Sequence, residues 1–154
     1  MVILEDTRQQ RGKHDIKHTY WNECGIEVKR TKLVVGDYMV FGGTVIIDTK
    51  KDVEEIAANI GGKEHARFRE ECKLAQKLGA QLVILVENRD GIYTLPDVAR
   101  WVNPNPRKVA QSIEGPRLAK AMKTMSDRYG VTFMFCTPEE SGELIIRLLE
   151  GNCE

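Results

Sequence analysis

The segment Gly36–Glu54, which reads GDYMVFGGTVIIDTKKDVE, is the part of the chain from which a fold can first be predicted. Two apolar runs, Tyr38–Phe41 and Val45–Ile47, flank the pair Gly42-Gly43. A Gly-Gly pair between β-branched and aromatic residues is typical of a tight turn, so we expect an antiparallel β-hairpin here.

Three polar side chains of this hairpin are expected at one edge of a sheet. Asp48 and Lys50 share a face, because alternate residues of a strand point the same way. A tight hairpin would bring Asp37 close to Asp48 across the ladder. Two carboxylates and a lysine can hold a hard divalent cation beside a proton-transfer group, as metal-assisted phosphodiester hydrolysis requires.

A purely structural interpretation competes with this one, because aspartate is common at strand ends. It is the better interpretation for Asp37 or Asp48 taken alone. The joint pattern reverses the preference. An aspartate is unusual in a strand that begins with the β-branched run Val45–Ile47, and Lys50 shares the face of this aspartate. Together the three residues favour a catalytic site.

The same residues carry a resemblance to a known family. Asp37 followed by Asp48–Lys50 resembles the D…(D/E)xK signature of the PD-(D/E)XK nuclease superfamily. More narrowly, the chain resembles the XPF-type structure-specific endonuclease domain, whose core reads GDY…ERKxxxD. Gly36–Tyr38 matches that core, and Asp6–Gln9 resembles its upstream DxRE element. The similarity continues through Phe68 and a later buried strand into the C-terminal helices.

The chain departs from the family pattern at several positions. Asp48 replaces the usual glutamate, Thr49 replaces the arginine, and Gln9 replaces the glutamate of the upstream element. Glu54 stands at the spacing of the last aspartate, and Asp52 takes that place if the register slips by two. The carboxylate and lysine chemistry is retained in spite of these changes.

Strands interleave with helices along the chain, which predicts an α/β fold. The resemblance implies a restriction-endonuclease-like PD-(D/E)XK core with a mixed central sheet flanked by helices. We expect residues 1–154 to form a single nuclease domain without a helix-hairpin-helix module. The other predicted elements are strands at 1–4, 27–35, 81–86 and 131–136, and helices at 16–24, 52–60, 64–78, 97–102, 116–129 and 139–149, the last with Thr137 as its N-cap.

The expected reaction assigns a role to each polar residue. Asp37 and Asp48 are predicted to bind Mg²⁺ or Mn²⁺ directly, with the backbone carbonyl of Thr49 as a further ligand. Lys50 would orient or deprotonate the attacking water, or stabilise the phosphorane by its charge. Asp6 would either support a second metal ion or hold a neighbouring arginine; the sequence leaves both roles open.

Basic residues near the site are candidates for phosphate contacts. They are Arg8, Lys51, Lys63, Arg67 and Arg69. For Lys73 and Lys77 a solvated helix face is the better interpretation, with an ion pair between Glu70 and Lys73. Glu87 ends a buried strand and could approach the site, but a surface carboxylate is the preferred interpretation.

The composition restricts the class of protein. The 154 residues contain 23 Lys and Arg and 23 Asp and Glu, so net charge does not predict nucleic-acid binding, which must depend on a local patch. Cys24, Cys72, Cys136 and Cys153 are dispersed, which fits buried thiols in a reducing compartment. No signal-peptide pattern or long apolar run occurs, so a cytoplasmic protein is expected.

Three functions agree with these features. The leading one is an endonuclease that binds DNA and cuts branched or flapped structures. The alternatives are a non-catalytic subunit of a nuclease complex, and a restriction-type or junction nuclease on the same fold. Apolar excess in the helices 116–129 and 139–149 predicts a homodimer, and a partner protein could also supply DNA binding. Cover from the segment Asn88–Pro106 is the competing explanation of that apolar excess.

Overall fold

The computed structural model describes residues 1–104 and 113–151 and contains a six-stranded mixed sheet in the order β2-β1-β3-β4-β5-β6. β1 runs parallel to β2 and antiparallel to β3, β3 is antiparallel to β4, and β4, β5 and β6 are mutually parallel. The strands are β1 (Val2–Asp6), β2 (Glu27–Thr31), β3 (Tyr38–Met39), β4 (Val45–Lys50), β5 (Gln81–Glu87) and β6 (Thr132–Cys136). The α/β prediction is therefore confirmed.

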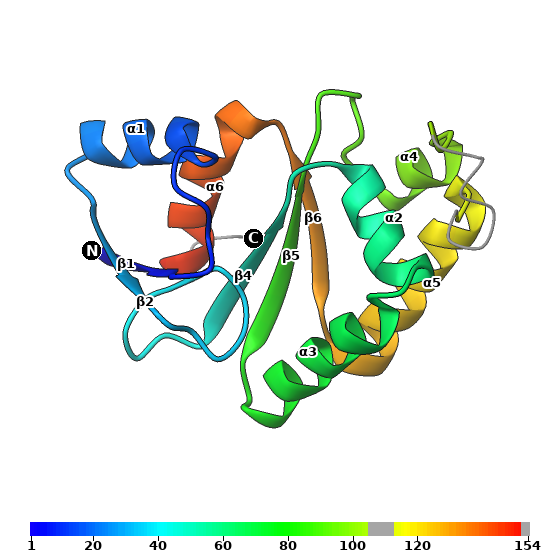
Figure 1. The fold of residues 1–154 in the computed structure, drawn as a ribbon, viewed down its shortest axis with the longest axis horizontal. Coiled ribbons are helices and arrows are strands. Elements are labelled where there is room, and N and C mark those ends of the chain that lie inside the picture. Colours follow the sequence, from blue (N-terminus) through cyan, green and yellow to red (C-terminus); the bar gives the residue numbers. More distant parts are fainter. Residues whose placement is uncertain (105–112, 152–154) are drawn as a thin grey trace.

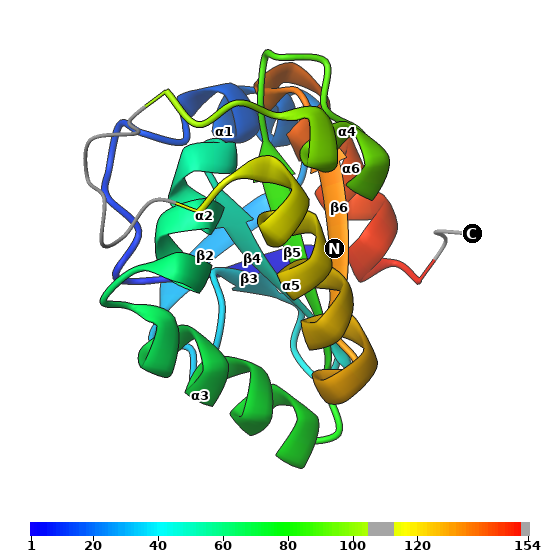
Figure 2. The same cartoon turned by 90° about the vertical axis from the view of Figure 1, so that its right-hand side faces the viewer.

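Helices cover both faces of this sheet. One group lies on the right of the sheet in Figure 1 and in front of it in Figure 2, and contains α2 (Val53–Gly61), α3 (His65–Lys77), α4 (Leu95–Arg100) and α5 (Gly115–Tyr129). The other face carries α1 (Asp15–Glu23) and α6 (Pro138–Leu149), which pack against each other.

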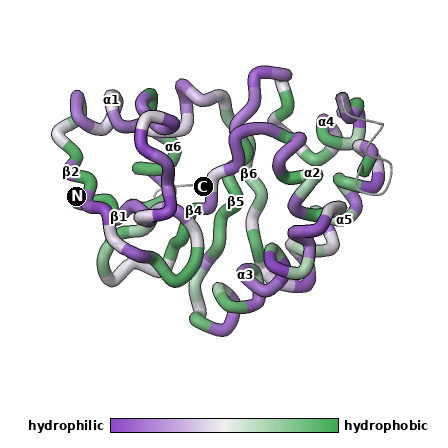
Figure 3. The backbone as a smooth tube through the Cα atoms, viewed as in Figure 1, coloured by the Kyte–Doolittle hydropathy of each residue, from purple (hydrophilic) through white to green (hydrophobic). Residues whose placement is uncertain are grey.

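Two apolar clusters form the core, one on each face of the sheet. The larger joins β5 residues such as Ile84 to α2, α3 and α5, and includes the buried Phe68. The smaller joins Ile47 and Leu85 to Trp21 of α1 and to α6. Hydrophobic residues accordingly gather along β4, β5 and β6, as Figure 3 shows. None of the helices within 1–104 and 113–151 combines the length and apolarity that a membrane span requires.

The predicted hairpin is present, although its turn lies one residue earlier than expected. Tyr38 pairs with Ile47 in antiparallel register. The backbone N–H of Gly43 donates to the carbonyl of Val40 at 3.0 Å, so Phe41 and Gly42 form the centre of the turn. Gly42 has φ of 75°, a value at which glycine is favoured over other residues.

Most predicted helix ends agree with the structure. Thr137 caps α6 in a reciprocal capping box with Glu140, as the sequence indicates. Asp52 caps α2, its side chain accepting a hydrogen bond from the N–H of Glu55 at 2.7 Å. The prediction missed the box between Thr94 and Asp97, which starts α4 two residues before the expected position.

Two local expectations were wrong. The strand predicted at 27–35 ends at Thr31, because the N–H of Leu33 leaves the ladder and donates to the Asp6 carboxylate at 2.9 Å. Of the cysteines, Cys72 and Cys136 are buried as expected, whereas Cys24 is exposed. Cys153 lies outside the described residues.

Candidate active site

The backbone at Gly36 brings the first carboxylate of the site against β4. Gly36 has φ of 74°, and a Cβ atom there would lie 2.5 Å from Ile46 Cγ2 and 3.0 Å from the carbonyl oxygen of Ile47. The next residue, Asp37, donates its backbone N–H to that same carbonyl at 2.8 Å. A side chain at position 36 would therefore push Asp37 away from β4.

The second carboxylate and the lysine come from the C-terminal end of β4. In the parallel ladder Asp48 lies beside Ile84 and Lys50 beside Val86. Their side chains share one face, as predicted, and Lys50 Nζ lies 3.0 Å from Asp48 Oδ2. The ammonium group also lies 5.2 Å from the centroid of the Phe68 ring, within the range of a cation–π contact.

The ionisation of this group is shifted by burial and by mutual repulsion. Burial and the neighbouring Asp48 raise the pKa of Asp37 well above its usual value, although Asp37 Oδ2 accepts hydrogen bonds from Thr49 N–H at 2.8 Å and Thr49 Oγ1 at 2.9 Å. Burial lowers the pKa of Lys50, but Asp48 outweighs it, so the pKa is raised overall. Lys50 is therefore held as a cation.

These residues line one polar cavity of about 270 Å³ between β4, α2 and α3. The sequence interpretation missed several residues that line it, including Glu55 and Asn59 of α2 and Glu71 of α3. Helical spacing could have grouped Glu55 with Asn59, because the two are four residues apart on α2. Burial raises the pKa of both Glu55 and Glu71. The lining is Gln9, Asp37, Asp48, Thr49, Lys50, Glu55, Asn59, Glu64, Arg67, Phe68 and Glu71.

The donor set of this cavity fits a divalent cation that keeps much of its hydration shell. No group of three His, Cys, Asp or Glu side chains within 1–104 and 113–151 is arranged to hold a metal ion by itself. Asp37 and Asp48 nevertheless repel each other, and Asp48 Oδ2 is buried without a hydrogen-bond donor of good geometry. Mg²⁺ needs only one or two carboxylates, so a cation between these two would relieve both features.

The upstream carboxylate, Asp6, is fully engaged beside the cavity rather than within its lining. Asp6 Oδ2 accepts from Arg8 Nε at 2.5 Å, and Oδ1 accepts from the N–H of Leu33 at 2.9 Å. Burial raises the pKa of Asp6, but the Arg8 hydrogen bond and other donors outweigh it, so the pKa is lowered. Of the two roles that the sequence left open, these contacts favour holding Arg8.

The predicted phosphate-binding residues are divided among different surfaces. Arg8 and Lys51 line a second cavity of about 490 Å³, to which Thr49 and Lys50 also contribute. Arg67 lines the catalytic cavity. Arg69, two residues later on α3, lines a separate cavity beside α5.

The last candidate, Lys63, is exposed and lines none of these cavities. On the solvated face of α3, Lys73 lies 3.4 Å from Glu70, which confirms the predicted ion pair.

The surface position expected for Glu87 was wrong. Glu87 is 7% exposed, and its Oε1 lies 2.5 Å from the Nζ of Lys17 on α1. It lines the second cavity together with Thr49 and Lys50. A partner seventy residues earlier in the chain leaves no local signal, so sequence spacing could not identify this pair.

Comparison with known proteins agrees with this architecture. A family model described as the ERCC4 domain matches residues 6–148. The solved structure of XPF from Aeropyrum pernix is similar, with a TM-score of 0.68 and 19% identity over 97% of this chain and 64% of the other. The same protein in complex with DNA gives a TM-score of 0.66 at 19% identity, over 97% of this chain and 63% of the other. A search among curated proteins found no match.

Proposed function

Because the chain belongs to the ERCC4 domain family, with an XPF-type nuclease fold, we propose that it is a metal-dependent endonuclease that hydrolyses phosphodiester bonds in DNA. The observation that carries the proposal is the convergence of Asp37, Asp48 and Lys50 in one polar cavity. Branched or flapped DNA is the proposed substrate.

The residues of the cavity divide the work of phosphodiester cleavage. Lys50 is held as a cation by Asp48, so it serves to stabilise negative charge on the phosphate in the transition state and to orient the attacking water, rather than as a base. Thr49 fixes the Asp37 carboxylate through two hydrogen bonds. Because Asp37 is fixed in this way, little reorganisation is needed when the substrate binds.

Asp37 and Asp48 would hold the Mg²⁺ or Mn²⁺ ion, with the carbonyl of Thr49 as a backbone ligand. The ion would supply a Lewis acid and an acidified water at the scissile phosphate. Glu55 and Glu71, whose pKa values are raised by burial, line the same cavity and are available to accept protons there.

Binding of DNA is proposed to depend on more than this chain's net charge, which is zero. Arg8 and Lys51 offer cations beside the catalytic cavity. The related Aeropyrum pernix protein was solved in complex with DNA, and this chain spans less than two thirds of its length. We therefore propose that a second protomer or a partner protein contributes to the DNA-binding surface.

Metal-dependent cleavage tests the catalytic proposal. Purified protein should cut labelled flaps or forks with Mg²⁺ or Mn²⁺ and stop when EDTA is added. Asp37→Asn and Lys50→Ala should each lower the rate at least about a hundredfold, because each removes a charge that acts on the transition state. Circular dichroism would check that both variants fold. Equal residual cleavage by the wild type and both variants would show that a contaminant cuts the DNA.

A non-catalytic subunit is the second candidate function, because XPF-type assemblies often pair an active protomer with a degenerate one. Loss of a carboxylate or of the lysine is the expected mark of such a subunit. This chain retains Asp37, Asp48 and Lys50, and their geometry favours the enzyme.

The homodimer remains a proposal. Within the chain, α1 covers part of the apolar surface of α6, since Trp21 packs there and donates its indole N–H to the carbonyl of Gly142 at 2.9 Å. Ile146 stays only partly buried, and β6 lies at one edge of the sheet with Phe133 and Phe135 half-buried. An unpaired edge beside apolar side chains favours association through this region.

Light scattering tests this association. The wild type should have the mass of a dimer, and Ile146→Glu should have that of a folded monomer, because a charge there would be buried by the contact. Arg147→Gln, at an exposed neighbouring position, is the control and should stay dimeric. A wild type that remains monomeric at high micromolar concentration would contradict the proposal.

A further inference from the structure

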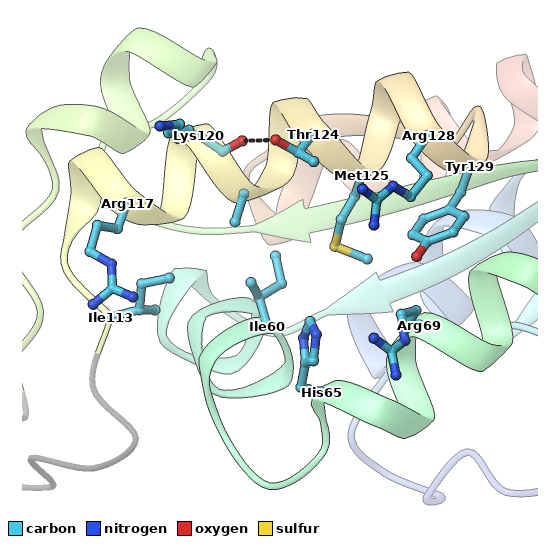
Figure 4. Close-up of a pocket in the computed structure, with 11 residues that line it drawn as sticks. Ile60, His65, Arg69, Ile113, Arg117, Lys120, Thr124, Met125, Arg128 and Tyr129 are labelled. Carbon is cyan, nitrogen blue, oxygen red and sulfur yellow. Dashed lines mark hydrogen bonds between the residues drawn. The ribbon is translucent and has the colours of Figure 1, made fainter.

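A third cavity, of about 370 Å³, lies between α3 and α5 and takes other residues of α3 than the catalytic cavity does. Figure 4 shows His65 and Arg69 reaching from α3 toward α5, from which Arg128 and Tyr129 point back. Its lining is Ile60, His65, Arg69, Ile113, Arg117, Lys120, Ala121, Thr124, Met125, Arg128 and Tyr129, a set without any carboxylate.

The cations of this cavity differ from other cations on the same helices. On α3, Arg67 lies within 3.8 Å of carboxylates of Glu64 and Glu71. On α5, Lys123 lies 2.6 Å from Asp127. These residues have the ion pairs that are usual for a solvated helix face.

By contrast, the arginines and the lysine of the cavity have no ion pair within the described parts of the chain. They are Arg69, Arg117, Lys120 and Arg128. The Nε of Arg69 is in addition buried without a hydrogen-bond partner among the described residues. A chain with zero net charge has thus gathered around one hollow four cations that lack an ion pair among the described residues, which creates a local attraction for anions.

The floor of the cavity is apolar and narrows the choice of anion. Ile60 is 6% exposed, Met125 6% and Tyr129 9%, so these side chains present a buried surface beneath the cations. A cavity of this size fits a small organic group better than an inorganic phosphate alone. Proteins that bind single-stranded nucleic acids combine cations that follow the backbone with aromatic and apolar surfaces for the bases.

We propose that this basic pocket binds a short segment of single-stranded nucleic acid, with successive backbone phosphates held by the four cations and one base against the apolar floor. A second copy of the chain in a symmetric contact is a poor occupant, because it would bring four like charges against these four. That this single strand belongs to the DNA that the protein cleaves rests on the proposed function.

The position of the pocket also suggests what binding there would do. The pocket and the catalytic cavity are lined by different sides of α3, and a helix is about 10–12 Å wide with its side chains. A stacked strand rises about 3.4 Å per nucleotide, so a separation of one helix width corresponds to about three nucleotides between the nucleotide in the pocket and the cleaved bond. The pocket would therefore set the distance between a single-stranded arm and the cut.

Binding of a fluorescein-labelled twelve-residue oligothymidylate, measured by fluorescence anisotropy in EDTA, tests the pocket without cleavage. Arg117→Glu with Lys120→Glu should weaken binding about tenfold or more, and should lower the slope of log affinity against log salt by about 1.4 if two phosphate contacts are lost. The milder pair Arg117→Gln with Lys120→Gln should give a smaller loss in the same direction.

The matched control reverses two cations outside the pocket, Lys123→Glu with Arg147→Glu, which changes net charge by the same amount. It should weaken binding less than about twofold at 0.15 M salt, because Lys123 and Arg147 lie outside the pocket and already pair with Asp127 and Glu143, and distant charges are screened at that salt concentration. Equal losses in the control and the pocket variant, or no loss in either pocket variant, would overturn the proposal. So would displacement of the oligonucleotide by thymidine monophosphate or polyglutamate at the oligonucleotide's own concentration.

Cleavage gives a separate readout. On a labelled flap, wild type should cut at a defined position and the pocket variant at positions spread over several nucleotides. If no metal ion allows the wild type to cleave DNA but binding in EDTA still depends on the pocket, the proposed nuclease function is wrong and the proposed pocket is supported. If the pocket variant binds normally and cuts at the same position as the wild type, only the proposed pocket is wrong.

Discussion

Two lysine–carboxylate pairs lie at the same end of the sheet but on opposite faces. Lys50 and Asp48 are two residues apart on β4 and point toward α2 and α3, into the polar catalytic cavity. Lys17 and Glu87 join α1 to the end of β5 on the other face. The first pair follows from the two-residue period of a strand, whereas the second exists only because the fold brings α1 over β5.

The surroundings of the two pairs suggest different uses. The first shares its cavity with Asp37, whose pKa is raised by burial and by Asp48. The charged form of Asp37 therefore lowers the stability of the fold. The second has a lysine that is only 4% exposed and a single carboxylate partner. We infer that the first pair serves chemistry and the second holds a helix in place, and three substitutions test that difference.

The largest effect on stability is expected from Lys17→Met. This change leaves the buried Glu87 carboxylate without its cation, and breaking a buried pair from one side typically costs about 3–5 kcal/mol. Urea denaturation of wild type and variant should show a fall in the free energy of unfolding within this range. A loss below about 1 kcal/mol would show that water in the neighbouring cavity hydrates the Glu87 carboxylate and screens its charge.

Removing both partners should cost less than removing one. In Lys17→Met with Glu87→Gln no unpaired charge remains. We therefore expect the double variant to recover most of the stability that Lys17→Met loses, consistent with a coupling of about 0.5–3 kcal/mol between contacting residues. A double variant no more stable than Lys17→Met alone would indicate that the lysine contributes through the packing of its aliphatic chain instead.

The smallest effect on stability is expected from Lys50→Met, although it should abolish cleavage. Asp37 can take up a proton, so the two carboxylates of the cavity need not both stay charged when the lysine is lost. We expect a change of about 1 kcal/mol or less in the free energy of unfolding, because functional charges are commonly neutral or costly for stability. A loss as large as that of Lys17→Met would remove the distinction between the two pairs.

The contrast also shows which parts of the molecule could be predicted from sequence. The hairpin turn, the shared face of Asp48 and Lys50 and the capping of α6 depend on residues within four positions of one another, and all were predicted, the turn to within one residue. The interaction of Leu33 with Asp6, which ends β2 early, and the burial of Glu87 by Lys17 depend on distant residues. Periodicity carries no information about such contacts.

The candidate site divides in the same way. Its β4 residues were found from local spacing, whereas Glu71 of α3 enters the cavity only through the packing of that helix over β4. Arg67 and Arg69 were grouped as one binding surface because they are neighbours in the chain. Residues two positions apart on a helix point about 200° apart around its axis. Arg67 and Arg69 therefore line cavities on different sides of α3.

The contact between α1 and α6 has a consequence for the order of folding. Trp21 is completely buried, and its indole N–H reaches the carbonyl of Gly142, 121 residues later in the chain. Ribosomes release the chain from the N-terminus at about 5–20 residues per second, so this tryptophan, which also packs against Tyr38, waits for at least several seconds before α6 emerges. Until then α1 cannot complete the packing of this large apolar side chain, so we expect the face of the sheet that carries α1 to become ordered only after α6 is synthesised.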